Sequence, residues 1–178
     1  MKATSRWLLT STCVFALMGC ASEALVQSLA SDGGPKQAQY KGQYKVVAVD
    51  VASEAKAEEI TDQISAAIVS KLRSSRAFDR VLSKSVTLEK RFDLVISVTP
   101  KDYINRDTSQ AWLGIFGGRS SLKVQVVLLD GNTGRTLVSG VIEGKARTKT
   151  TIFTSSSMAL AIDLVGEEVA KFALHHIQ

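Results

Sequence analysis

Two stretches of alternating apolar residues, joined by a tight turn, constrain the fold most strongly. Residues 121–130, "SLKVQVVLLD", carry an apolar side chain at every second position, which is typical of a strand with one face on a core. The turn residues of "DGNTG" at 130–134 follow, and "RTLVSGVIEGKA" at 135–146 reads as the returning strand. We therefore expect a long antiparallel hairpin.

A strand, a helix and a second strand are predicted upstream of this hairpin. The β-branched run "YKVVAVDV" at 44–51 indicates a strand buried on both faces. Ser53 is expected to cap a helix ending near Ser74. Its apolar stripe repeats every four residues: Ile60, Ile64, Ile68 and Leu72. "FDRVL" at 78–82 fits a short strand, and this order suggests a right-handed crossover between parallel strands.

Two further elements complete the predicted domain. "FDLVISVT" at 92–99 alternates and indicates a half-buried strand. Serines at 155–157 can cap a C-terminal helix whose apolar positions share one face: Met158, Ile162, Val165, Val169 and Phe172. Since two amphipathic helices need one sheet to cover, we expect an α+β two-layer sandwich. Its sheet is expected to be mixed but largely antiparallel, in the order strand, helix, strands, helix.

The first twenty residues have the order of an exported leader. Lys2 and Arg6 precede an apolar run of about a dozen residues, shorter than the roughly 20 needed to span a membrane. Leu17-Met18-Gly19-Cys20 resembles the bacterial lipobox, in which the cysteine is acylated and becomes the new N-terminus; Met18 is an uncommon residue at its position. The alternative is an ordinary signal peptide with an incidental cysteine.

This interpretation divides the chain into three parts. We expect a signal peptide at 1–19, a lipidated N-terminus and flexible tether at 20–43, and one globular domain at 44–178. Residues 24–30 can form a turn or two of helix within the tether. Because Cys13 would leave with the signal peptide and Cys20 would carry lipid, the domain has no thiol for a disulfide or a metal site.

Composition agrees with a globular chain whose charge is only moderately positive. Of 178 residues, 45% are hydrophobic and 22% are charged. The net charge is +5, and without Lys2 and Arg6 it is 20 basic minus 17 acidic residues, or +3. This excess can favour anionic lipid headgroups or an acidic cell-wall polymer. Lysine and arginine are scattered along the sequence, so we expect no nucleic-acid binding.

A glycine-rich segment between the predicted strands is the main candidate for binding. "GIFGGRSS" at 114–121 lacks the spacing of a P-loop, has Arg119 in place of lysine, and precedes a strand instead of a helix. Its glycines instead allow a bend or bulge. Ile115 and Phe116 either cap the core or lie at an exposed loop tip, and Tyr103 and Trp112 are either core residues or exposed contacts. We therefore predict a possible partner-binding loop at 101–120, with these candidate residues: Tyr103, Trp112, Ile115, Phe116 and Arg119.

No arrangement of residues predicts a catalytic site, a cofactor or a metal. The 130–134 segment lacks the further acidic ligands and the distal glutamate of an EF-hand. His175 and His176 are adjacent and so lie on different faces of a helix. The serines have no histidine in a recognisable arrangement, and no motif assigns acid and base roles to the aspartates of this region: Asp93, Asp102 and Asp107.

The middle of the chain resembles a known family. "GIFGGRSSLKVQVVLLDGNTGRTLVSGVIEG", preceded by "FDLVISVTPKDY", is similar to bacterial lipoproteins that carry domain of unknown function number 4410, over roughly residues 44–176. The order of elements is also similar to the curli-export pore subunit and to the lipoproteins that activate penicillin-binding proteins. The family implies an envelope lipoprotein and supplies no catalytic residue, and similar architecture does not imply a shared function.

These observations predict a non-enzymatic outer-membrane lipoprotein facing the periplasm. Ala21 and Ser22 follow Cys20 where retention signals of the inner membrane usually carry aspartate, which favours the outer membrane by resemblance. The expected partner is an envelope protein or cell-wall polymer. One alternative is a subunit of a homo-oligomeric ring or export assembly, although 101–120 shows no clear membrane-crossing hairpin. The other alternative is a small envelope hydrolase.

Overall fold

The structure is a computed structural model of the chain. It describes residues 22–27, 43–53, 58–84, 91–106, 119–147 and 157–177. For Ser22–Gln27, Glu58, Glu59, Arg106 and Arg147 it describes the backbone alone.

The described residues form one six-stranded mixed sheet in the spatial order β1-β6-β5-β4-β2-β3. The strands are β1 (Ser22–Gln27), β2 (Val46–Val51), β3 (Arg80–Ser83), β4 (Leu94–Arg106), β5 (Arg119–Asp130) and β6 (Thr136–Arg147). β2 is parallel to both β3 and β4, whereas β4, β5, β6 and β1 pair antiparallel in turn. The predicted parallel strands and the predicted hairpin are therefore both confirmed.

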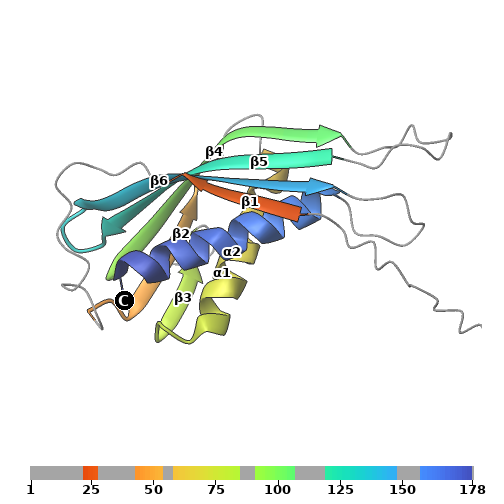
Figure 1. Cartoon of the computed structure of the whole chain (residues 1–178). Coiled ribbons are helices and arrows are strands. Elements are labelled where there is room, and N and C mark those ends of the chain that lie inside the picture. Colours follow the sequence, from red (N-terminus) through yellow and green to blue (C-terminus); the bar gives the residue numbers. More distant parts are fainter. Residues whose placement is uncertain are drawn as a thin grey trace, which may run out of the picture.

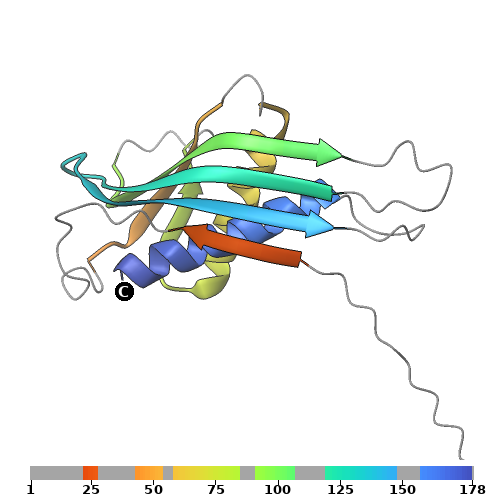
Figure 2. The ribbon, with the colours of Figure 1, turned by 45° about the horizontal axis from the view of Figure 1, so that its top comes forward.

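Two helices cover one face of this sheet. Figure 1 shows α1 (Glu58–Ser75) and α2 (Ser157–Ile177) on the same side, and in Figure 2 they lie behind the row of strands. The predicted stripe of α1 is buried, with Ile64, Ile68 and Leu72 fully inaccessible. The predicted apolar face of α2 is buried as well. The α+β sandwich, in the order strand, helix, strands, helix, is confirmed.

The centre of the sheet is buried as the sequence pattern indicates. Val47, Ala48 and Val49 of β2 have no exposed surface, because β2 lies between β3 and β4. The four alternate apolar residues of β5 are also fully buried: Leu122, Val124, Val126 and Leu128. Burying one such side chain contributes about 1.5–3 kcal/mol.

The first strand corrects the prediction for the tether. We expected a turn or two of helix at 24–30, but Ser22–Gln27 is β1, paired antiparallel with β6 from Ser22 opposite Ala146 to Gln27 opposite Val141. The pairing supplies backbone hydrogen bonds that a short isolated helix would lack in water. The sheet therefore includes residues upstream of the domain start expected at Tyr44.

The second correction concerns the loop predicted at 101–120. β4 extends to Arg106 and β5 begins at Arg119, so strand pairing continues into both ends of this segment. A shift of register between Pro100 and Asp102 marks a bulge, which lets β4 continue beyond a residue that cannot donate a backbone hydrogen bond. The predicted glycine bend at 114–118 lies outside the described residues.

α2 packs very closely on β6. A Cβ atom added to Gly144 would lie 2.8 Å from the carbonyl oxygen of Ala161 and 2.8 Å from a methyl carbon of Val165. Glycine at this position therefore lets the helix backbone approach the strand.

The predicted helix caps are described only in part. The cap at Ser53 involves residues 54–57, which lie outside the described residues, as do 155 and 156 before α2. Ser157, the first residue of α2, is fully buried, and its hydroxyl lies 2.6 Å from that of Ser120 in β5. This contact fixes the start of α2 on the sheet.

Candidate functional site

The predicted binding residues fall into two groups. Cys20, Trp112, Ile115 and Phe116 lie outside the described residues. Tyr103 is in β4 and Arg119 is the first residue of β5, so neither is in the loop that we expected.

The structure brings Tyr103 and Arg119 to the same end of the sheet but turns them to opposite faces. Tyr103 pairs with Leu122 and packs, partly buried, against the core, which favours the core interpretation. Arg119 is exposed. Its neighbour Ser120 faces α2, and since side chains alternate along a strand, Arg119 faces away from the helices.

Three arginines from three strands meet in one row at this end. Arg106 of β4 pairs with Arg119 of β5, and Arg119 pairs with Arg147 of β6. We call these three residues the arginine row. Like charges directly opposite one another destabilise a sheet, so the row departs from ordinary sheet design.

The start of β1 lies next to the arginine row. Ser22 pairs with Ala146, the neighbour of Arg147. In Figures 1 and 2 the end of β4, the start of β5, the end of β6 and the start of β1 all lie at the right. We call this group of strand ends the loop end of the sheet. It consists of Ser22, Ile104–Arg106, Arg119–Ser121 and Lys145–Arg147.

Other side chains of the loop end supply an ion pair and one apolar group. Lys145 forms an ion pair of 3.2 Å with Glu143, so these two charges offset each other. Ile104, opposite Ser121, is 43% exposed, the one large hydrophobic residue so exposed among the described side chains. On the helix side, the hydroxyl of Ser120 donates to the side-chain oxygen of Asn105 at 3.3 Å.

The opposite end of the sheet is a tight turn. The Oδ1 atom of Asp130 accepts hydrogen bonds from the N–H of Asn132 at 3.1 Å and from the N–H and hydroxyl of Thr133, both at 2.8 Å. The bonds from Thr133 lower the pKa of Asp130 below its ordinary value. Gly131 donates to the carbonyl of Asp93, and an added Cβ would lie 1.9 Å from the carbonyl oxygen of Phe92.

Asp93 and Asp102, the two described aspartates considered for acid and base roles, do not form a pair. Asp93 accepts the N–H groups of Lys45 and Val46, each at 2.9 Å, and so joins the start of β4 to the start of β2. Asp102 is exposed in β4, and Asp107 lies outside the described residues. The Asp93 carboxylate therefore has a structural role.

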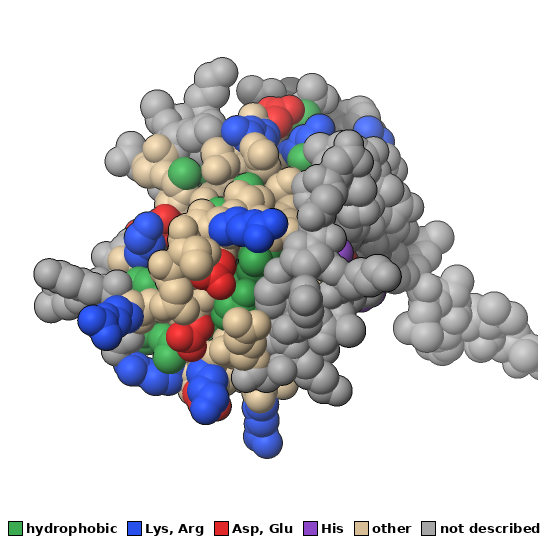
Figure 3. All heavy atoms as spheres, turned by 90° about the vertical axis from the view of Figure 1, so that its left-hand side faces the viewer, with side chains coloured by type: hydrophobic (Ala, Val, Ile, Leu, Met, Phe, Trp, Pro, Cys, Tyr) green, Lys and Arg blue, Asp and Glu red, His purple; other side chains and the backbone are tan. Residues whose placement is uncertain are grey.

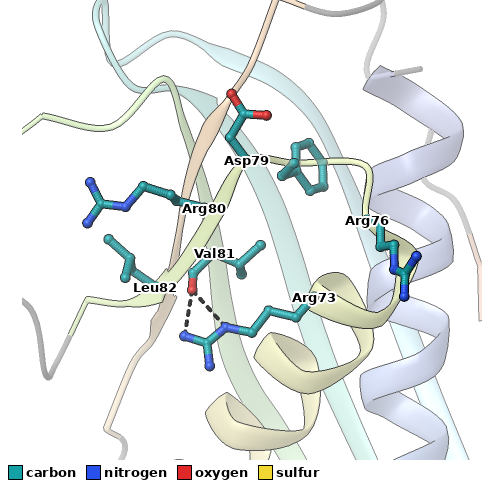
Figure 4. A pocket seen from close by; sticks show the side chains of 7 residues that line it. Arg73, Arg76, Asp79, Arg80, Val81 and Leu82 are labelled. Carbon is teal, nitrogen blue, oxygen red and sulfur yellow. Dashed lines mark hydrogen bonds between the residues drawn. The ribbon is translucent and has the colours of Figure 1, made fainter.

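A shallow depression of about 410 Å³ lies beside β3. Three arginines line it, and sequence reasoning overlooked them although "RSSRAFDR" holds all three: Arg73, Arg76 and Arg80. Arg73 donates from Nε and Nη2 to the carbonyl of Val81 at 3.1 and 2.8 Å. In Figure 4 Arg76 and Arg80 point away from each other. The guanidinium groups do not converge on one ligand, and Arg73 instead covers the edge of β3.

The two histidines lie at the end of α2. The ring of His176 contacts that of Phe172 edge to face at 4.6 Å, and the ring centroid of His175 lies 5.1 Å away. Burial, and secondarily the nearby charge of His175, lower the pKa of His176. Within the described part of the chain no three His, Cys, Asp or Glu side chains gather as metal ligands.

Neither described helix has the length and apolarity needed to cross a bilayer.

The sequence shows the members of the arginine row but not the row itself. Positions 106, 119 and 147 are far apart in the chain, and a register shift at Pro100 lies between them and the predicted strand. The predicted hairpin was the one feature of the sequence that could have revealed the row, because it implies that the strand before the turn pairs with the strand after it. The sequence pattern ended the first of the three strands seven residues too early, began the second two residues too late and ended the third one residue too early, so all three arginines fell outside the predicted strands.

Comparison with family models gives one match. The model described as "Domain of unknown function (DUF4410)" matches residues 35–152, about two thirds of the chain. The match starts nine residues before the region that we expected and ends before α2. No protein among the curated ones matches the sequence.

Solved structures share the fold at low sequence identity. A PelC dodecamer from Paraburkholderia phytofirmans has a TM-score of 0.53 and 13% identity, over 89% of this chain and 99% of that one. A hypothetical protein from Chlamydia trachomatis has a TM-score of 0.50 and 13% identity, over 75% of this chain and 98% of that one. At such identities the likeness shows a common fold alone.

Proposed function

We propose, from the premise that this chain belongs to the DUF4410 family, that it is a non-enzymatic lipoprotein of the bacterial cell envelope. It is anchored through lipid on Cys20 to the periplasmic side of the outer membrane. Its globular domain binds an envelope protein or cell-wall polymer through the segment between β4 and β5, with Trp112, Ile115 and Phe116 as contacts and Arg119 at its base.

One observation carries this proposal. β1 starts two residues after Cys20 and at the same end of the sheet as the segment between β4 and β5. An anchor at Cys20 would therefore bring the strand ends that flank that segment close to the membrane surface, where a membrane-bound partner is within reach.

Photo-crosslinking in cells tests the binding segment. A photoreactive amino acid is placed at Trp112 or Phe116, and a matched control is placed at Asn132, in the turn at the other end of the sheet. We expect a discrete crosslinked product from positions 112 and 116 and none from 132. Products from the control position alone would contradict the proposal.

A second candidate function is a subunit of a homo-oligomeric ring. No described helix covers the second face of the sheet, whose half-buried residues include the apolar Val95, Val127, Leu129 and Val141 beside polar residues such as Ser97, Thr99 and Gln125. The fold is also like that of a protein that is itself a dodecamer. The photo-crosslinking experiment separates the candidates, because a ring predicts products of twice the mass of the chain itself.

A further inference from the structure

The loop end of the sheet has a charge pattern that the proposed partner-binding role does not require. The arginine row sets Arg106, Arg119 and Arg147 at adjacent register positions. The cost of opposing like charges falls when anions lie against them. The row therefore indicates an anionic ligand with several negative groups side by side.

The short distance along the chain between Cys20 and the start of β1 identifies this ligand. Cys20 is joined to Ser22 by a length of chain that spans at most about 7 Å, and Ser22 pairs with Ala146, the neighbour of Arg147. Acyl chains on Cys20 would enter the bilayer beside the row. A membrane surface of anionic phospholipid is then the multivalent anion within reach.

The rest of the loop end fits such a surface. Ile104 is 43% exposed and lies two positions along β4 from Arg106, on the face that Arg119 also occupies. An apolar side chain beside basic residues is the composition of an interfacial contact with membrane. At the opposite end of the molecule, shown in Figure 3, Lys and Arg alternate with Asp and Glu over the described surface.

We infer that the arginine row binds the headgroups of anionic phospholipids. Together with Ile104, the row holds the loop end of the sheet against the membrane surface. This inference rests on the proposed anchoring at Cys20. It adds a second contact that fixes the orientation of the domain, which attachment through Cys20 alone would leave free to rotate.

The test uses the full-length protein, expressed with its leader, extracted from membranes and reconstituted into vesicles. Because the domain has no cysteine, the change Ile104→Cys introduces one site for a polarity-sensitive fluorophore. Vesicles of phosphatidylcholine alone are compared with vesicles in which about a third of the lipid is phosphatidylglycerol. We expect a blue shift and protection from an aqueous quencher only with phosphatidylglycerol, and loss of both at high salt.

Arginine variants then identify the contact. Each basic residue near an anionic leaflet strengthens binding about fivefold, so changing all three residues of the row to serine should weaken seating about a hundredfold. The matched control changes three exposed arginines elsewhere to serine: Arg76, Arg91 and Arg135. Arg119→Ser alone, about fivefold weaker, serves if the triple variant does not fold.

Two results would overturn the inference. One is equal fluorophore protection in both kinds of vesicle, and the other is an equal loss in the control variant. Thiol titration shows separately whether Cys20 carries lipid. If Cys20 is acylated, the cysteine introduced by Ile104→Cys is the one reactive thiol of the mature chain. A second reactive thiol would refute lipidation and leave the lipid dependence of the row measurable by vesicle flotation.

Discussion

Asp130 shows how a single side chain sets the register of the β5–β6 hairpin. One carboxylate oxygen accepts three hydrogen bonds from the turn, and the other oxygen accepts the hydroxyl of Tyr44 at 3.4 Å. The turn fixes which residues of β5 and β6 face each other, and so it also aligns Arg119 with Arg147 at the far end.

Replacing Asp130 should destabilise the fold in a pH-dependent way. Asp130→Ala should lower the free energy of unfolding by about 1–2 kcal/mol at pH 7, because the bonds to the carboxylate are lost. The folded pKa is lowered, so this stabilisation is present above the unfolded pKa of about 3.9 and is lost as pH falls through the folded value.

Urea unfolding over a pH series measures this effect. The difference between wild type and Asp130→Ala should shrink as the pH falls below about 4. Asp130→Asn is the matched control, since it keeps an acceptor oxygen and does not titrate. A difference that stays constant down to low pH would contradict a role for the ionised carboxylate.

At the scale of elements, the close packing of α2 on β6 requires a glycine at position 144. Gly144→Ala should lower the free energy of unfolding by about 1–3 kcal/mol, because the new methyl group would overlap the Ala161 carbonyl. Thermal or chemical unfolding measures the change. Ser139→Ala, on the other face of β6, is expected to stay within about 0.5 kcal/mol, and equal effects would argue against close packing at Gly144.

Elements with a strong periodic pattern could be predicted from the sequence, and β1 could not. The apolar stripe of α1 and the alternating apolar residues of β5 each correspond directly to buried positions. The sequence therefore predicted correctly that the first is a helix and the second a strand. "SEALVQ" in β1 contains good helix formers, and pairing with β6 overrides that preference. The ends of β4 and β5 were missed because charged residues continue the pairing beyond the apolar core.

At the scale of the whole molecule, the candidate site also depends on strand pairing that the sequence pattern does not show. The sequence pointed to Tyr103 and Arg119, and the structure keeps Arg119 at the surface while Tyr103 packs on the core. The arginine row arises from register between strands that are distant in sequence, which composition and motifs do not contain. The lipidation site remains a prediction from the lipobox alone.

The proposed anchor would give the two ends of the sheet different environments. With lipid at Cys20 the loop end faces the membrane and the Asp130 turn faces the periplasm, since the two lie at opposite ends of β5. Without it, neither the binding segment nor the arginine row has a fixed relation to the bilayer.

The most direct measurement is therefore metabolic lipid labelling with membrane fractionation of the wild-type chain and of Cys20→Ser. The account predicts that wild type takes up the lipid label and sediments with the outer membrane. It predicts that Cys20→Ser loses both the label and its retention in the membrane. Retention of an unlabelled wild-type chain, unchanged by Cys20→Ser, would contradict the anchor and with it the proposed orientation of the sheet.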